Sequence, residues 1–275
     1  MTGTVGRGRD SRFDAGIFGN SHALLLDPSR LSPATRLRFV QLTTLGSTPR
    51  EQMALIRYFL RRHADAKALV LAADRFWCMH DPALPNTMAP PGYSFPYWLF
   101  GDSRLRYVAH MLSARPFGLM RRRILLAMGR LAPIDPAGTA AYPASWDFAH
   151  AVQAPPEPRV PWDGSPIPTD FPAIDRLGAL LATLPLDVAV VVAMPPLYYE
   201  LLPGPGTRQA AELASCKDRL ARAVEGQRRR GAFLDFLVDS PLSRERANFF
   251  DKQHMGEAVA RAMEVRIAQA LNASR

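Results

Sequence analysis

Cysteine and long apolar runs are scarce in this 275-residue sequence, and each scarcity excludes a class of protein. The two cysteines, Cys78 and Cys216, are far apart and do not have the spacing of metal ligands, so we expect no metal site. Cys78 follows an apolar segment and is better explained as a small buried residue than as a nucleophile, while a disulfide with Cys216 stays open. No apolar run approaches the roughly 18 residues of a membrane-spanning helix.

Lysine is scarce as well, although the net charge is +9. Only Lys67, Lys217 and Lys252 are present, so nearly all of the positive charge is arginine. A basic chain is typical of proteins that bind nucleic acid or anionic membranes. Here the arginines are spread along the chain, and a GC-rich genome by itself produces such a preference for arginine. We therefore expect no nucleic-acid partner.

Five short apolar segments predict strands that are covered on both faces, as in a parallel sheet. They are residues 13–19, 38–43, 68–73, 187–194 and 233–238. Segments with helical periodicity separate or follow them, at residues 49–62, 171–184, 207–230 and 255–271. This alternation predicts one α/β domain over residues 1–275, a doubly wound three-layer sandwich with about five parallel strands.

Residues 80–170 interrupt the alternation and contain many prolines. We interpret them as an insertion between strands three and four that covers the carboxyl edge of the sheet, where ligands bind in such folds. Residues 120–131 predict a basic amphipathic helix with Arg121, Arg122 and Arg123. A packed helix with a solvated arginine face is the favoured interpretation, and contact with an anionic membrane surface is the alternative.

Small and polar residues follow the first two predicted strands. Gly19-Asn20-Ser21-His22 ends the first, and Gly46-Ser47-Thr48-Pro49 follows the second. A hydroxyl nucleophile needs a base, a group that orients the base and donors for the oxyanion. Ser21 offers the hydroxyl at a possible helix start, where free N–H groups are available. Gly46 offers a bare backbone N–H.

Asp251 and His254 follow the last predicted strand, three residues apart on a turn that enters a helix. This spacing places the two side chains on the same side. The carboxylate then accepts from one imidazole nitrogen while the other nitrogen faces the serine, as in a catalytic triad. Because the carboxyl ends of parallel strands share one edge of the sheet, we expect these turns to converge there.

In these blocks the sequence resembles the SGNH (GDSL-type) hydrolases and acyltransferases, in particular bacterial envelope-associated members. Gly19-Asn20-Ser21 matches the Gly-Asp-Ser block, Gly46 the oxyanion glycine, and Asp251 with His254 the Asp-x-x-His block. The resemblance implies a flavodoxin-like fold without a cofactor. It implies a serine-dependent esterase, deacetylase or O-acyltransferase that acts on an acylated small molecule or saccharide. Ser21 would be the nucleophile, His254 the base and Asp251 its orienting group, with the N–H groups of Ser21 and Gly46 binding the oxyanion.

The sequence departs from the family pattern in two places, and the absence of the third block favours an alternative function. Asn20 stands where the family has aspartate, and the third block, Gly-x-Asn, is not found. Asp74 follows the third strand instead, where it would bind substrate or cap a turn, and its charge would repel an oxyanion. The alternative is a non-catalytic protein of the same fold that assembles or binds envelope polysaccharide.

Further residues complete the predicted site. We expect the substrate site to be lined by Asn20, His22, Asp74 and Tyr198. Two of these residues have a competing interpretation: His22 could instead face solvent, and Tyr198 could instead pack in the core. The literal Gly-Asp-Ser string at residues 101–103 lies in the predicted insertion, where Asp102 or Ser103 is explained as a helix cap.

The compartment stays open at this point. Residues 1–12 are polar and glycine-rich, which predicts no signal peptide. As the sequence stands, a cytoplasmic location in a bacterium is expected. A periplasmic location is expected if an amino-terminal anchor or signal precedes this chain.

Overall fold

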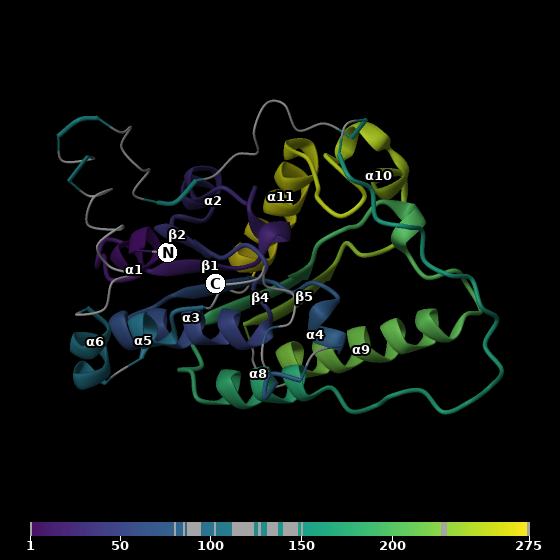
Figure 1. The fold of residues 1–275 in the computed structure, drawn as a ribbon, viewed down its shortest axis with the longest axis horizontal. Coiled ribbons are helices and arrows are strands. Elements are labelled where there is room, and N and C mark those ends of the chain that lie inside the picture. Colours follow the sequence, from purple (N-terminus) through teal and green to yellow (C-terminus); the bar gives the residue numbers. More distant parts are fainter. Residues whose placement is uncertain are drawn as a thin grey trace.

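The computed structural model describes residues 2–79, 81–84, 86, 95–101, 103–111, 124–125, 128–130, 137–139, 148–149, 151–226 and 230–273. Its centre is one sheet of five parallel strands in the order β2-β1-β3-β4-β5 (Figure 1). The strands are β1 (Ala15–Gly19), β2 (Phe39–Thr43), β3 (Ala68–Ala72), β4 (Ala189–Met194) and β5 (Gly231–Asp235). This confirms the predicted α/β class and the parallel sheet.

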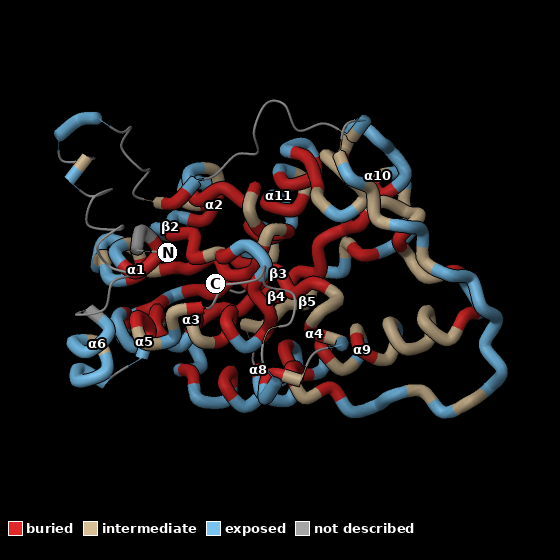
Figure 2. Tube along the Cα trace, viewed as in Figure 1, coloured by how far each residue is buried: buried red, intermediate tan, exposed pale blue. Residues whose placement is uncertain are grey.

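Both faces of the sheet are covered, which explains the continuous apolar runs in the sequence. Successive side chains of a strand point to opposite faces. In β1, Phe18 belongs to one core cluster and Ile17 to the other. In β4, Val190 and Val192 belong to the first cluster and Val191 to the second. Figure 2 shows the resulting buried centre of the molecule.

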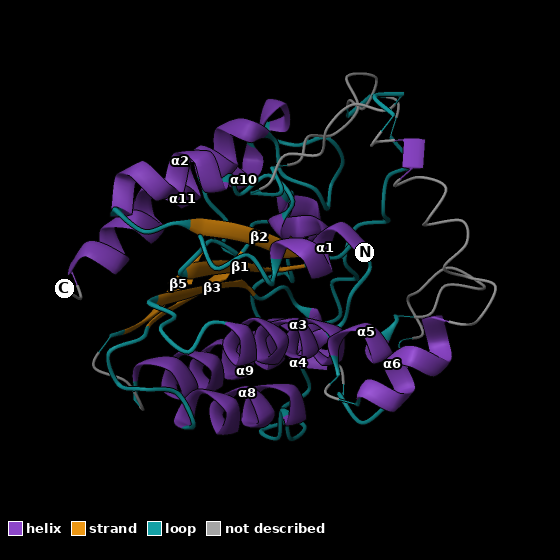
Figure 3. Ribbon diagram, turned by 90° about the vertical axis from the view of Figure 1, so that its left-hand side faces the viewer, coloured by secondary structure: helices purple, strands orange, loops and turns teal. Residues whose placement is uncertain are grey.

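Helices form the outer two layers (Figure 3). One face is covered by α3 (Pro49–Arg62), α8 (Pro172–Ala182) and α9 (Arg208–Glu225), and the other by α2 (Pro28–Thr35) and α11 (Glu257–Ala273). The shorter described elements are α1 (Thr2–Arg7), α4 (Phe76–Met79), α5 (Tyr97–Phe100), α6 (Arg104–Met111), α10 (Pro241–Arg244) and the 3-10 turns η1 (Ser21–Ala23), η2 (Tyr199–Leu201) and η3 (Arg246–Asn248). Among the helices described here, none combines the length and apolar character needed to cross a membrane.

Two elements differ clearly from the sequence expectation, because α9 ends at Glu225 rather than at residue 230 and β5 is displaced along the chain. The strand spans Gly231–Asp235 rather than residues 233–238. Its register explains the difference, since Gly231 pairs with Val190 and Asp235 with Met194, the last residue of β4. The neighbouring strand thus determines where β5 begins and ends, while the apolar run in the sequence continues beyond it.

Much of the predicted insertion, residues 80–170, lies outside the described residues, and its position over the carboxyl edge stays a prediction. Arg121, Arg122 and Arg123 belong to the part that is not described. Ser103 is described, and its hydroxyl accepts a hydrogen bond of 3.2 Å from the backbone N–H of Arg106 in the first turn of α6. The literal Gly-Asp-Ser string therefore ends in a helix cap, as predicted for it.

Candidate active site

Ser21 lies at a sharp turn directly after β1. The strand ends at Gly19, and η1 begins at Ser21. Gly19 has a φ of +152°, and a Cβ atom there would lie 2.7 Å from the Cβ of Ala23 and 3.1 Å from the carbonyl oxygen of Ala72. Any larger residue would force these neighbours apart. The glycine therefore lets the chain turn tightly enough to present Ser21 at the carboxyl edge of the sheet.

Asp251 organises the loop that carries the histidine. Its Oδ1 accepts hydrogen bonds of 2.7 Å from the backbone N–H groups of both Gln253 and His254. The loop is closed by a hydrogen bond of 2.9 Å from the N–H of Phe250 to the carbonyl oxygen of His254. The same carboxylate thus shapes the backbone and contacts the imidazole ring.

The structure brings Ser21, His254 and Asp251 together, with the ring of His254 between the other two side chains. The Nδ1 atom of His254 lies 2.8 Å from Oδ2 of Asp251, and its Nε2 lies 3.0 Å from the Oγ of Ser21. An ionised carboxylate only accepts hydrogen bonds, so the proton of the neutral ring belongs on Nδ1. The Nε2 lone pair then faces the hydroxyl of Ser21, the geometry that general-base activation requires.

The pKa of Asp251 is lowered from its ordinary value. Burial by itself raises this pKa, but the hydrogen bond and positive charge of His254, together with the backbone N–H groups of Gln253 and His254, outweigh the burial. The carboxylate is therefore ionised at neutral pH, and it stabilises positive charge on the neighbouring ring.

Asn20, His22 and Asp74 form a buried network beside Ser21. The side-chain amide of Asn20 donates to Oδ2 of Asp74. The Oδ1 of Asn20 accepts from the backbone N–H of His22 at 3.0 Å, and the Nδ1 of His22 lies 2.9 Å from the same oxygen and 3.1 Å from Oδ2 of Asp74. Asp74 also accepts from the N–H of Phe76 at 3.0 Å. The carboxylate of Asp74, which follows the third strand, thus receives all of these hydrogen bonds from donors within the chain.

His22 connects this network to the triad geometry. Its ring stacks on the ring of His254, with the centroids 5.3 Å apart and the planes 15° apart. Because both partners of its Nδ1 are acceptors, that nitrogen carries a proton. Its buried Nε2 has no hydrogen-bond partner in the part of the chain that the structure describes. Of the two interpretations of His22, solvent exposure is wrong, since the residue is only 8% exposed.

Gly46 lies in the turn after β2, next to the turn of Ser21. The N–H of Thr44 and the hydroxyl of Ser47 both bond to the carbonyl oxygen of Gly19, at 3.2 and 3.4 Å. Gly46 itself is exposed and has a φ of +64°, a conformation that glycine adopts without strain. Thr44 and Ser47, on either side of Gly46 in this turn, therefore attach the turn to the end of β1.

Tyr198 packs among aromatic side chains, in agreement with the packing interpretation, and its place in a substrate site stays a prediction. Its ring contacts those of Phe148, Tyr199 and Phe249, and burial raises the pKa of its phenol. Its backbone N–H donates to the carbonyl oxygen of Lys252 at 2.9 Å. Tyr198 thus supports the loop that carries Asp251 and His254.

An ion pair fastens the two helices that follow the site segments. Arg30 of α2 contacts the buried Glu264 of α11 through Nε at 2.6 Å and through a terminal nitrogen at 2.8 Å. Glu264 also accepts from the backbone N–H of Asp27 at 2.7 Å. Since α2 follows Ser21 and α11 follows His254, this contact helps to hold the two catalytic candidates in register.

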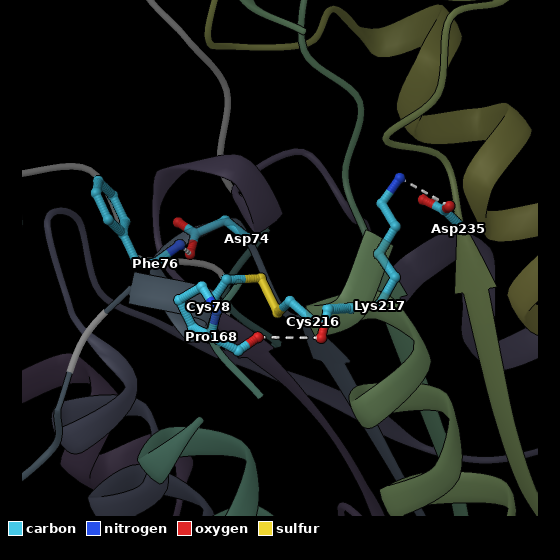
Figure 4. The surroundings of a disulfide bond; sticks show 8 residues. Asp74, Phe76, Cys78, Pro168, Cys216, Lys217 and Asp235 are labelled. Atoms are coloured by element: carbon cyan, nitrogen blue, oxygen red, sulfur yellow. Dashed lines mark hydrogen bonds and ion pairs between the residues drawn. A yellow bond between two sulfur atoms is a disulfide. The ribbon is translucent and has the colours of Figure 1, made fainter. Parts of the chain in front are cut away.

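Sequence reasoning left the cysteines unassigned, and the structure joins Cys78 to Cys216 in a disulfide (Figure 4). The bond links α4, just after Asp74, to α9. The two residues are 138 positions apart, so no spacing rule in the sequence indicates the pairing. The two sulfur atoms meet because α4 and α9 pack on the same side of the sheet.

Among the described residues, no group of three or more His, Cys, Asp or Glu side chains is arranged to hold a metal ion. Comparison with models of known protein families finds no match, and comparison with curated proteins finds no significant match either.

Proposed function

We propose that this chain is a serine-dependent ester hydrolase or O-acyltransferase of the SGNH (GDSL-type) kind, with a saccharide or small-molecule ester as substrate. The observation that carries the proposal is the 3.0 Å contact between the Oγ of Ser21 and the Nε2 of His254, whose Nδ1 is bound by Asp251. The strand order β2-β1-β3-β4-β5, which is the flavodoxin-like order, supports the same kinship.

In the proposed first step, the Oγ of Ser21 attacks the ester carbonyl carbon while its proton moves to the Nε2 of His254. Asp251 stabilises the imidazolium. The tetrahedral intermediate collapses, the C–O bond of the ester breaks, and the leaving alcohol takes the proton from His254. Water, or a sugar hydroxyl in a transferase, then attacks the acyl-serine through the same base. The products are a carboxylic acid or a new ester, and Ser21 regains its proton.

The oxyanion requires donors in this mechanism. We assign that role to the backbone N–H of Ser21, at the start of η1, and to that of Gly46 in the adjoining turn. Asp74 is the group that would oppose an oxyanion. Its contacts with Asn20 and His22 reduce this opposition, because both supply hydrogen-bond donors to the carboxylate.

The second candidate function is non-catalytic binding or assembly of envelope polysaccharide by the same fold. The carboxylate of Asp74, at the position after β3 where the family has an amide donor, favours this candidate. The two candidates differ in the reactivity of Ser21, because only an activated serine reacts rapidly with a fluorophosphonate probe.

Substitution of the serine provides the test. We expect the wild-type protein to be labelled by a fluorophosphonate and to hydrolyse p-nitrophenyl esters, and Ser21→Ala to lose both properties. Ser103→Ala is the matched control, because Ser103 completes the literal Gly-Asp-Ser string but caps α6. Equal labelling and turnover by Ser21→Ala and the wild type would refute the proposal.

The disulfide bears on the proposed compartment. Such bonds persist in oxidising compartments and are rare in the cytosol. We therefore propose a periplasmic location for the folded chain. Alkylation of free thiols in intact cells, followed by mass spectrometry, tests this location. Fully alkylated Cys78 and Cys216 in the cellular protein would contradict it.

A further inference from the structure

His22 and His254 lie face to face beside Ser21. Their ring centroids are 5.3 Å apart, and the planes of the two rings differ by 15°. His254 lies on the loop that follows η3 and is partly exposed, whereas His22 is buried in η1, directly after β1. One face of the candidate base is therefore covered by a second imidazole that is itself buried.

The two edge contacts of His254 behave differently during the proposed reaction. Asp251 contacts Nδ1 through both carboxylate oxygens, at 2.8 and 3.0 Å, and this contact is kept throughout. The contact of Nε2 with the Oγ of Ser21 changes, because Oγ becomes bonded to the acyl carbon. The final torsion of a histidine side chain has broad energy minima, so the ring can rotate while the contact at Nε2 changes. A contact on the face of the ring limits this rotation and persists through both steps.

Hydrogen bonds fix the orientation of His22. Its Nδ1 lies 2.9 Å from Oδ1 of Asn20 and 3.1 Å from Oδ2 of Asp74. Its backbone N–H donates to the same oxygen of Asn20 at 3.0 Å. The Nε2 of His22 is buried and bonds to none of the described residues. The polar contacts of this ring with the described chain are therefore all at Nδ1, where Asn20 and Asp74 set its plane.

Asp74 is in turn fixed by packed helices. Its Oδ1 accepts from the N–H of Phe76, and its carbonyl oxygen accepts from the N–H of Trp77, both at 3.0 Å. Trp77 is fully buried, and its indole N–H donates to Gln52 of α3 at 3.0 Å. The disulfide from Cys78 joins α4 to α9 (Figure 4). The position of Asp74, and with it the ring of His22, is thus set by α3, α4 and α9.

We propose that His22 is a positioning residue for the candidate base, and that Asp74 holds His22 in place for this purpose. The inference rests on the proposed function. The ring of His22 keeps the plane of His254 fixed, so that Nε2 faces the Oγ of Ser21 whenever a proton moves between them. A misplacement of about 1 Å in an active site can lower the rate by about 10²-fold. The carboxylate after β3 therefore contributes to the reaction although it donates nothing to an oxyanion.

Substitutions that separate the ring of His22 from its hydrogen bonds test the proposal. His22→Gln keeps a donor for Asp74 but has no ring. We expect it to lower kcat for a p-nitrophenyl ester at least about tenfold and to change KM less than about twofold. His22→Phe keeps a flat ring against His254 and should recover kcat to within about threefold of the wild type. Wild-type kcat in His22→Gln, or equal losses in the two variants, would overturn the proposal.

His63→Gln is the matched control for these variants. His63 is also buried, and its ring also stacks on an aromatic ring, that of Phe59, with the centroids 4.2 Å apart. It follows α3 and precedes β3, so it lies at the opposite edge of the sheet from Ser21. We therefore expect His63→Gln to retain the wild-type kcat, whatever it does to stability.

NMR of isotope-labelled histidine rings separates this inference from the proposed function, because it requires no turnover. In the wild-type protein, nuclear Overhauser effects should connect the two rings, and their absence would overturn the stack. The ring signals of His254 should be sharp in the wild type and broadened or split in His22→Gln. Unchanged signals there would overturn the positioning role even if Ser21 proves to be the nucleophile. Broadened signals in a protein without Ser21-dependent turnover would support the ring contact and refute the proposed catalysis.

Discussion

The side-chain amide of Asn20 donates a hydrogen bond to the buried carboxylate of Asp74, across the carboxyl ends of β1 and β3. The amide therefore follows β1 and the carboxylate follows β3. A buried carboxylate that faces an amide donor is satisfied, so each of the two residues makes the other tolerable in a buried position.

This relationship predicts strong coupling between the two positions. Asn20→Asp places two buried carboxylates against each other, and we expect it to lower the free energy of unfolding by at least about 2 kcal/mol. Asp74→Asn leaves one acceptor oxygen where the carboxylate has two, so an NH₂ group must face either Asn20 and His22 or the N–H of Phe76, and the change should cost about 1–3 kcal/mol. Asn20→Asp/Asp74→Asn restores one carboxylate facing one amide, so its loss should be smaller than the sum of the two single losses. Urea unfolding at pH 7 measures all three, and strict additivity would contradict the coupling.

Asp251→Asn should lower kcat by about 10³–10⁴-fold while the protein remains folded, because an amide does not fix the Nδ1–H tautomer of His254 or stabilise the imidazolium. Steady-state hydrolysis of an ester by the purified variant measures the loss. Asp175→Asn, at an exposed ion pair on α8, is the control and should retain full activity. A decrease of less than about tenfold would show that Asp251 does not orient a catalytic base.

The lowered pKa of Asp251 also predicts a pH effect on stability. A carboxylate whose pKa is lower in the folded than in the unfolded state binds fewer protons when folded. It therefore stabilises the fold above its unfolded pKa, near the ordinary value of 3.8, and loses this contribution as the pH falls through the folded pKa. The stability difference between wild type and Asp251→Asn should be larger at pH 6 than at pH 3, as measured by urea unfolding. A difference that grows on acidification would contradict the assigned direction.

Gly19→Ala should both destabilise the protein and displace Ser21. A Cβ atom at Gly19 meets Ala23 at 2.7 Å in a backbone conformation that favours glycine, and we expect a loss of about 2–4 kcal/mol. Gly164→Ala is the matched control, since Gly164 also has a positive φ but has no heavy atom within 4 Å of the added Cβ. It should cost only about 1 kcal/mol. Thermal unfolding compares the two variants, and equal losses would show that the close approach at Gly19 does not matter.

Removal of the disulfide should destabilise the fold. The bond closes a loop with a sequence separation of 138 residues, and the double variant Cys78→Ala/Cys216→Ala should lose about 2–5 kcal/mol of unfolding free energy. Reduction of the wild-type protein should lower its stability similarly, whereas the double variant should not respond to the reductant. Denaturant unfolding with and without dithiothreitol checks both expectations. A wild-type protein that is insensitive to reduction would show that the bond contributes little.

The order of the strands along the chain, the α/β class and the approximate positions of α3, α8, α9 and α11 follow from the sequence, whereas α2 was not predicted. Val190, Val191 and Val192 illustrate the reason, because a short β-branched run that is apolar at successive positions is typical of a strand covered on both faces. Likewise the pair Asp251 and His254 is local, and their spacing of three residues on one turn allows the two side chains to meet. The end of β5 was not predictable, since its register depends on β4.

Only the tertiary structure decided how residues distant in the chain meet. The contact of Ser21 with His254 joins positions 233 residues apart, and the pairing of Asn20 with Asp74 spans 54. The same holds for the bond between Cys78 and Cys216. Composition and periodicity indicate which segments become buried and whether they form a helix or a strand, because burial pattern and secondary structure depend on neighbours along the chain. Which side chains face each other depends on the order and register of the strands in the sheet, and these are determined by the packing of the whole domain.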